Sequence, residues 1–276
     1  MKKIIPLVVI VILIIPLFIT VSGSGDHLKP SIVLVHGSWA DGSSWSRVIR
    51  NLQNEGYAVY APPNLLRGIP TDAAYIASFL STIQGPIVLV GHSYGGAVIT
   101  NAATGNPNVK ALVYVDAFAP DQGETLTDLA TAPPPPGQPA SCIAGDPTKI
   151  FNFVPIPGSQ GDFDLYVKPT LFPSCFANDL SASQGAVLAS TQLPPLLSGF
   201  PIQSGPPAWK AIPSWYVIGT LDNVIPEWAQ MFMAQRIQAH IVQVKAGHLS
   251  MISHSGAVAE VIEEAAHFVS GDTDND

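Results

Sequence analysis

The sequence predicts an α/β fold, in which a mostly parallel sheet of about six strands carries helices on both faces and an inserted cap. Two observations predict this class. Short, continuous apolar runs, typical of buried strands, alternate with longer segments whose apolar residues recur at helical spacing. That alternation is the pattern of parallel strands joined by crossover helices. The chain has 276 residues, enough for one large domain of this class.

The first part of the chain contains four predicted strands and three predicted helices. The strands are expected in the apolar runs SIVLVH (31–36), YAVYAP (57–62), PIVLVG (86–91) and ALVYVD (111–116). The helices are expected at 45–55, in a segment that Thr71-Asp72 caps at its N-terminus, and at 94–104.

Residues 120–210 interrupt this alternation. They contain PPPPGQP, VPIPG, LPP and GPP, and indicate loops with short helices such as 181–191. Because the stretch lacks an apolar periodicity long enough for its own core, we expect a cap over the active site. A separate small domain is the alternative. The pattern resumes with strands at 214–219 and 240–244 and helices at 227–239 and 255–269.

Residues 1–24 are expected to direct the protein out of the cytoplasm, leaving the folded domain at 25–276. Two lysines precede an uncharged apolar run from Ile4 to Val21, and the small residues Ser22 and Ser24 follow. A cleaved signal peptide is the first interpretation. An uncleaved membrane anchor is the alternative, because ~18 apolar residues nearly span a bilayer. A buried helix is the third, and Pro6 and Pro16 argue against it. We therefore expect a secreted or membrane-anchored, extracytoplasmic protein.

Composition argues against nucleic acid as a partner. The formal net charge is −8, and no run of Lys or Arg exists beyond Lys2-Lys3. No HExxH, CxxC or clustered His/Asp pattern indicates a metal site. Both cysteines, Cys142 and Cys175, lie in the irregular stretch, and in an exported protein we expect them to form a disulfide. Two unpaired buried thiols are the alternative.

The pentapeptide Gly91-His92-Ser93-Tyr94-Gly95 fits G-x-S-x-G and stands between a predicted buried strand and a predicted helix. This context predicts a nucleophile elbow, in which the glycines leave room at a sharp bend and the Ser93 hydroxyl projects above the sheet. The following helix directs its N-terminal amides at the same place, which favours developing negative charge. A phosphate-binding turn is the alternative, but it would need GxGxxG or a Lys-Ser/Thr pair, and neither is present.

A serine hydroxyl needs a base, and His248 in VKAGHLSM is the best candidate. It follows the last strand, and in this architecture ligand chemistry occurs at the carboxyl ends of the strands. The other histidines are expected elsewhere: His36 shaping its own loop, His92 pointing away from the elbow, and His240, His254 and His267 on the surface or in the core.

The histidine needs a carboxylate to hold its tautomer. Asp222, in VIGTLDNVIP, follows the fifth strand and gives the order Ser, Asp, His. Asp116, in VYVDAFAP, is the alternative acid, and otherwise reads as a buried carboxylate that anchors a loop.

The backbone amides of Ser38 and Tyr94 are expected to form the oxyanion hole. Four apolar residues flank these motifs and are expected to line the substrate pocket, with ordinary core packing as the alternative for each: Trp39, Phe118, Leu249 and Met251.

Together these residues resemble the α/β-hydrolase superfamily over nearly all of 31–270. The segments VLVHGSWADGSSW, GHSYGG, VYVDAFAPDQGE, AWKAIPSWYVIGTLDNVIP and AGHLSM are similar to the small serine esterases related to plant methyl-ester esterases and hydroxynitrile lyases. The resemblance implies a Ser93–His248–Asp222 triad, no cofactor and an apolar pocket under a cap. The first two strands of the full superfamily fold are not evident, so about six strands are expected rather than eight.

The expected activity is hydrolysis of a small, neutral, fairly apolar carboxylic ester through an acyl-enzyme, because the sequence offers no charged anchor for a carboxylate or phosphate. A cofactor-free haloperoxidase or lyase on the same triad, and a non-catalytic small-molecule receptor on the same fold, are the alternatives. The lyases of this branch carry a lysine after the catalytic histidine and a threonine in the HG pair. Leu249 and Gly37 occupy those positions here, which favours the esterase.

Overall fold

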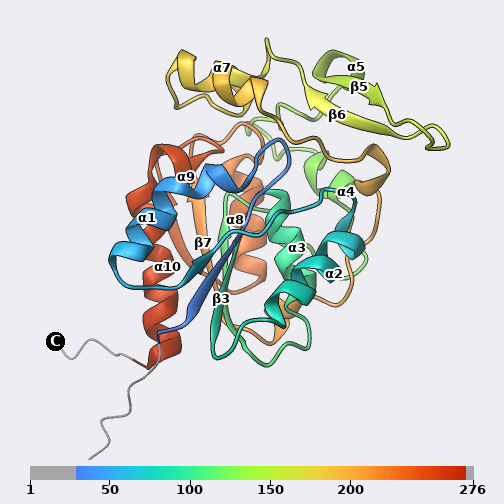
Figure 1. The fold of residues 1–276 in the computed structure, drawn as a ribbon. Coiled ribbons are helices and arrows are strands. Elements are labelled where there is room, and N and C mark those ends of the chain that lie inside the picture. Colours follow the sequence, from blue (N-terminus) through green and yellow to red (C-terminus); the bar gives the residue numbers. More distant parts are fainter. Residues whose placement is uncertain (1–28, 272–276) are drawn as a thin grey trace, which may run out of the picture.

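A six-stranded sheet, parallel throughout, forms the centre of the fold in the computed structural model, which describes residues 29–271 (Figure 1). The strands follow the order β2-β1-β3-β4-β7-β8. They are β1 (Ser31–Val35), β2 (Val59–Tyr60), β3 (Ile87–His92), β4 (Val109–Val115), β7 (Ser214–Gly219) and β8 (His240–Val244). The predicted α/β class and the number of strands are confirmed.

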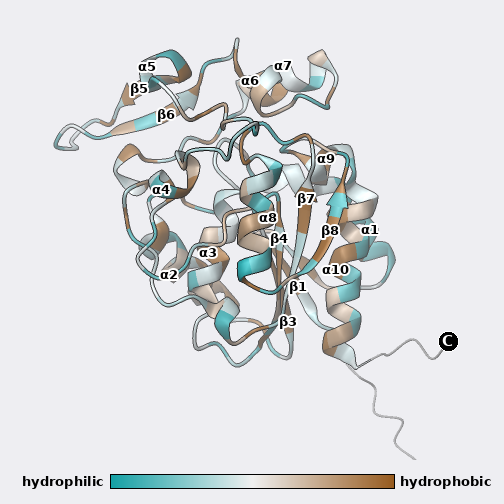
Figure 2. Cartoon of the chain, turned by 180° about the vertical axis from the view of Figure 1, so that it is seen from behind, coloured by the Kyte–Doolittle hydropathy of each residue, from teal (hydrophilic) through white to brown (hydrophobic). Residues whose placement is uncertain are grey.

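Burial explains why the sequence segments that form the central strands are apolar at nearly every position. Every residue of β3 and of β7 is buried, whereas the edge strand β8 is exposed or half-buried along its length. Strands covered by helices on both faces need apolar residues at every position, and the central strands are mostly apolar in Figure 2.

Helices cover both faces of the sheet. The helices α1 (Ser46–Asn54) and α10 (Ser255–Ser270) pack together on one face, while α2 (Ile69–Leu80), α3 (Tyr94–Ala102) and α8 (Glu227–Arg236) lie on the other (Figures 1 and 2). A 3-10 turn, η1 (Gly42–Trp45), precedes α1, and a short helix, α9 (Ser250–Ser253), precedes α10. No helix within 29–271 has the length and hydrophobicity needed to span a membrane. The expectations for residues 1–24 lie outside the described residues.

The predicted N-cap at Thr71-Asp72 is wrong. The helix α2 begins at Ile69, after Gly68, whose φ of 114° is accessible to glycine. Asp72 lies inside the helix and is fully buried, and its carboxylate accepts hydrogen bonds from the Arg67 amide and, at 2.5 Å, from the Tyr94 hydroxyl. A tertiary contact, which the local pattern cannot reveal, determines the role of this aspartate.

The residues from α4 to η2, between β4 and β7, form a layer above the carboxyl edge of the sheet, which we call the cap (Figure 1). Its elements are α4 (Leu126–Ala130), α5 (Pro147–Ile150), β5 (Phe151–Pro155), β6 (Phe163–Val167), α6 (Phe172–Cys175), α7 (Ala182–Ser190) and η2 (Leu197–Gly199). The chain then returns past the C-terminal end of α3, through η3 (Ala208–Lys210), to β7. The antiparallel hairpin β5–β6 was not predicted, because the proline-rich VPIPG indicated only a loop. The expected disulfide is present and joins Cys142 to Cys175, with 5.8 Å between the Cα atoms.

Candidate active site

Ser93 occupies the sharp bend between β3 and α3. Its φ of 52° and ψ of −122° are rarely adopted by a residue with a side chain, and strain of this kind is concentrated at functional sites. The bend closes because both flanking glycines lack a Cβ. A Cβ at Gly91 would lie 2.5 Å from the Gly95 carbonyl oxygen, and one at Gly95 would lie 2.3 Å from the Val35 carbonyl oxygen. The local sequence therefore dictates the elbow.

The structure brings Ser93, His248 and Asp222 together in one hydrogen-bonded chain. The Ser93 Oγ lies 3.0 Å from Nε2 of His248, and Nδ1 of His248 lies 2.7 Å from Oδ2 of Asp222. His248 follows β8 and Asp222 follows β7, so parallel strands deliver all three side chains to the same edge of the sheet. At most 4% of any of these residues is exposed. A hydroxyl so placed can pass its proton to the imidazole and attack a carbonyl carbon.

Further hydrogen bonds fix the Asp222 carboxylate. Its Oδ1 accepts the amides of Val224 and Ile225 at 2.7 and 2.9 Å, and its Oδ2 also accepts the Gln230 side-chain amide at 2.8 Å. Burial raises the pKa of Asp222, and the hydrogen bonds from the two backbone amides offset part of this increase. Burial also lowers the pKa of His248 to about 3. One proton shared between Nδ1 and Oδ2 leaves Nε2 as an acceptor for the Ser93 hydroxyl.

The alternative acid, Asp116, has a different partner. Its Oδ2 accepts the hydroxyl of Ser250 at 2.5 Å and the amide of the same residue at 3.3 Å. Burial and the nearby Asp222 charge raise its pKa well above the ordinary value, which favours a neutral carboxyl. Ser250 lies two residues after His248, so Asp116 anchors the loop that carries the imidazole. The geometry favours Asp222 as the partner of His248.

Two other histidines support the loops around Ser93. The His36 ring accepts the Asn64 amide at 3.0 Å, and its carbonyl accepts the Asn64 side chain at 2.9 Å, which fixes the loop after β1 as the HG pair suggested. His92 turns away from Ser93, but it is not remote from the site. Its Nε2 donates to the His248 carbonyl at 2.8 Å, and the two rings lie 4.8 Å apart.

The loop after β1 brings the Ser38 amide beside the elbow. A Cβ at Gly37 would lie only 2.7 Å from the Ser93 Cβ, so this glycine permits the close approach. The Tyr94 amide belongs to the first turn of α3, where a helix has no intrahelical acceptor. These are the two amides that the sequence proposes for an oxyanion hole.

A small cavity, of about 10 Å³, lies beside Ser93 and is lined without any charged side chain. Its apolar lining includes Trp39, Phe118, Leu126, Ile143, Phe200 and Val224. Of the four predicted pocket residues, Trp39 and Phe118 line it. Leu249 and Met251 are not among its lining residues, and both are buried in the hydrophobic core, which is the alternative that the sequence left open for them.

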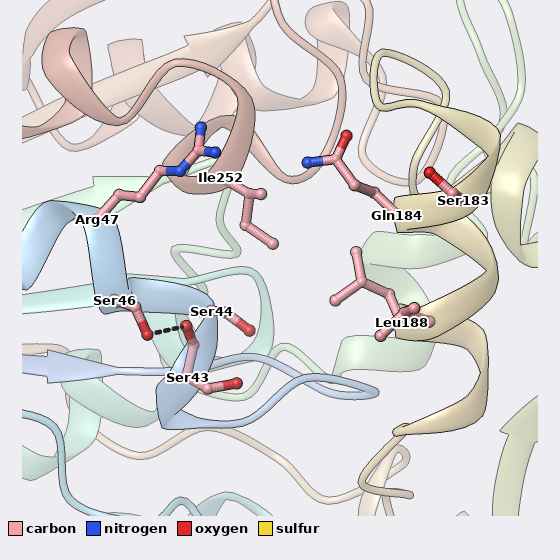
Figure 3. Close-up of a pocket in the computed structure, with 9 residues that line it drawn as sticks. Ser43, Ser44, Ser46, Arg47, Ser183, Gln184, Leu188 and Ile252 are labelled. Carbon is pink, nitrogen blue, oxygen red and sulfur yellow. Dashed lines mark hydrogen bonds between the residues drawn. The ribbon is translucent and has the colours of Figure 1, made fainter.

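A larger cavity of about 400 Å³ lies away from the triad, between η1, α1, α7 and α9. Figure 3 shows Arg47 and Ile252 on one side of this cavity, and Gln184 and Leu188, both of α7, on the other. None of its lining residues belongs to the predicted site. Within 29–271, no group of three or more His, Cys, Asp or Glu side chains could hold a metal ion.

Trp39, in the loop after β1, makes two of the hydrogen bonds that join the cap to the rest of the fold. The indole N–H donates to the Leu165 carbonyl of β6 at 2.8 Å, and the Trp39 amide donates to the Leu193 carbonyl at 2.9 Å. An ion pair of 2.5 Å between Arg67 and Asp164 joins the same two layers. These contacts position the cap over Ser93.

Three polar residues at the site were missed by sequence reasoning. Gln230 of α8 binds Asp222, as described above. The cap residues Asn178 and Asp179 contact the loops that carry Asp222 and His248: the Asn178 side chain donates to the Leu221 carbonyl, and Asp179 accepts the Gly247 amide, each at 2.8 Å. No motif marks them, because their roles depend on how the cap folds back over the sheet.

Comparison with known proteins places this geometry in a family. Residues 32–261 match the model of the alpha/beta hydrolase family. The carbendazim hydrolyzing esterase of Nocardioides sp. (strain SG-4G) is 34% identical over 128 residues, 42% of this chain and 53% of that protein, so the match spans about half of the esterase. The pyrethroid hydrolase of Sphingobium wenxiniae is 25% identical over 85% of this chain and 87% of its own.

Solved structures show the same fold. A methylesterase from Arabidopsis superposes with a TM-score of 0.68 at 16% identity, and the alignment covers 87% of this chain and 99% of that one.

Proposed function

Since the chain belongs to the alpha/beta hydrolase family, we propose that it hydrolyses a carboxylic ester through an acyl-enzyme intermediate. Ser93 is the nucleophile, His248 the general base and acid, and Asp222 the carboxylate that orients the imidazole. The single observation that carries the proposal is the buried chain of hydrogen bonds, at 3.0 and 2.7 Å, that ends on a strained serine. The named esterases among the relatives support the same class of reaction.

The reaction proceeds in two halves. His248 Nε2 takes the Ser93 proton as Oγ attacks the ester carbonyl, and the resulting oxyanion accepts hydrogen bonds from the Ser38 and Tyr94 amides. His248 then protonates the departing alcohol. Water repeats the sequence on the acyl-enzyme, losing its proton to His248 and releasing the acid and free Ser93.

The lining of the cavity beside Ser93 supports a proposal about the substrate class. Because no charged side chain lines this cavity, a substrate carboxylate or phosphate would be desolvated there without a partner. We therefore propose a neutral, fairly apolar ester of a small acid or alcohol.

The disulfide supports an extracytoplasmic location. Disulfides persist in oxidising compartments and are rare in the cytosol of mesophiles. The Cys142–Cys175 bond is therefore consistent with export directed by residues 1–24, as a signal peptide or a membrane anchor.

A panel of p-nitrophenyl esters of increasing acyl length tests the activity, with Ser93→Ala as the matched variant. We expect turnover by the wild type and a loss on the order of 10⁴-fold or more in Ser93→Ala and in His248→Ala, because the triad acts as a unit. A fluorophosphonate should label Ser93. An unlabelled wild type without ester turnover would instead indicate a receptor that only binds its ligand.

The lyase alternative is tested with mandelonitrile. A leucine after His248 supplies no positive charge for departing cyanide, and Gly37 leaves the space beside the Ser38 amide open. We expect negligible cyanide release. Ser93-dependent release at the rate of the best ester would overturn the esterase proposal.

A further inference from the structure

The cap places a second carboxylate against the loop that carries His248. Asp179 lies between α6 and α7, its side chain is only 10% exposed, and its Oδ2 accepts the Gly247 amide at 2.8 Å. A Cβ at Gly247 would lie 2.8 Å from Oδ1 of Asp179, so the glycine permits this approach. Among the described residues, that Oδ1 is buried without a hydrogen-bond partner.

The neighbours of Asp179 fix it in place. Asn178 donates to the Leu221 carbonyl, directly before Asp222, and the Phe176 ring meets the His248 ring edge-on at 5.5 Å. A short cap segment, 176–179, thus contacts both loops that carry the orienting acid and the base. Asp179 is therefore a mostly buried residue in a segment that contacts both loops.

A buried carboxylate with an unpartnered oxygen is costly unless a positive charge appears beside it. The proposed reaction creates such a charge, because His248 becomes an imidazolium each time it takes a proton from Ser93 or from water. The Asp179 charge raises the pKa of His248, against the larger lowering by burial. It therefore favours the protonated imidazole.

We propose that Asp179 is a positioning residue through which the cap supplies a second negative charge that stabilises the His248 imidazolium during acyl transfer. The inference rests on the proposed function. If Asp179 has this role, the stability of the His248 imidazolium depends on a residue of the cap. The active site is then complete only when the cap is in place.

Other titratable groups also face His248 and enter the expected pH dependence. Asp222 accepts a hydrogen bond from Nδ1 of His248, and Asp116 interacts electrostatically with Asp222. The His92 ring lies 4.8 Å from the His248 ring, and burial holds the pKa of His92 well below its ordinary value. His254, at the end of α9, lies 3.9 Å from Oδ2 of Asp179 and is partly exposed. When protonated, His254 offsets part of the Asp179 charge.

The test is Asp179→Asn in the full-length protein, because asparagine can still accept the Gly247 amide while the charge is lost. We expect kcat for the best p-nitrophenyl ester to fall about tenfold with KM changed by less than about threefold. The acid limb of the kcat profile should move to lower pH by roughly one unit, since removing a nearby negative charge lowers the pKa of the imidazole. Asp146→Asn, which removes an exposed cap carboxylate at the start of α5, is the matched control and should behave as the wild type.

A second variant keeps the inference testable if Asp179→Asn does not fold. His254→Gln removes a side chain that offsets the Asp179 charge whenever it is protonated, so the acid limb should move in the opposite direction, to higher pH. An unchanged kcat, or a lower kcat with an unmoved acid limb, in Asp179→Asn overturns the inference. An acid limb that stays in place in His254→Gln also overturns it. Absence of Ser93-dependent turnover in the wild type contradicts the proposed function itself.

Discussion

Asp116 and Asp222 lie after neighbouring strands, and both are buried, yet they have different partners. Asp222 accepts hydrogen bonds from two backbone amides, from the Gln230 side chain and from Nδ1 of His248. Asp116 receives the Ser250 hydroxyl, and burial together with the adjacent Asp222 charge raises its pKa well above the ordinary value. Two identical side chains thus have separate tasks, one electrostatic and one structural.

Paired asparagine substitutions test this division. Asp222→Asn should lower kcat by roughly 10³- to 10⁴-fold, because an amide no longer holds the tautomer that leaves Nε2 free. Asp116→Asn should cost less than about tenfold, since the amide oxygen can still accept the Ser250 hydroxyl and little charge is lost. The measurement is kcat on the best p-nitrophenyl ester, with circular dichroism to confirm folding. The reverse ranking would make Asp116 the triad acid.

At the scale of elements, the strand–elbow–helix unit depends on glycines that no side chain can replace. We expect Gly95→Ala to destabilise the fold by several kcal/mol, because the added methyl would lie 2.3 Å from a backbone carbonyl oxygen that cannot move freely. Thermal and urea unfolding measure the loss. Gly256→Ala is the control: it lies in α10 with no atom within 4 Å of the added methyl, so it should be neutral or stabilising by up to about 1 kcal/mol. Equal effects of the two substitutions would contradict the elbow's steric explanation.

The central strands could be predicted because burial on both faces leaves a continuous apolar record in the sequence. Once these strands were predicted, Ser93, Asp222 and His248 could be selected as site residues. Each of them follows a predicted strand, and the carboxyl ends of parallel strands meet at one edge of the sheet. The position of the cap in the sequence could be predicted, but its secondary structure could not. Its hairpin depends on packing against Trp39, whose indole binds β6, and no local periodicity indicates that contact.

The residues that line the pocket, and the polar residues that support the triad, could not be predicted from the sequence, because their positions also depend on tertiary contacts. Leu249 and Met251 lie within three residues of His248 in sequence and are buried in the core, while Asp179 comes from a distant segment. Adjacency in sequence says little about which side of a loop faces a cavity. The way the cap folds over the sheet determines which side chains face the cavity.

At the scale of the whole molecule, the disulfide joins two cap segments 33 residues apart in sequence. In the chain-entropy model, closing such a loop stabilises the folded state by roughly 3–4 kcal/mol. The double variant Cys142→Ser/Cys175→Ser should therefore unfold at a lower temperature and lower urea concentration, with kcat largely retained where it stays folded. Thiol titration of the unfolded, unreduced wild type should find no free thiol. Two free thiols would refute the bridge.

The cavity beside Ser93 holds about one water molecule, and Trp39 and the Arg67–Asp164 pair fasten the cap above it. Because this cavity is too small for an ester, we expect the side chains or the cap above Ser93 to move before the ester binds and again before the acid departs. If that movement is slower than the chemistry, kcat for a readily cleaved ester should fall as sucrose raises the viscosity of the medium. A kcat that does not change with viscosity would show that the movement does not limit the rate.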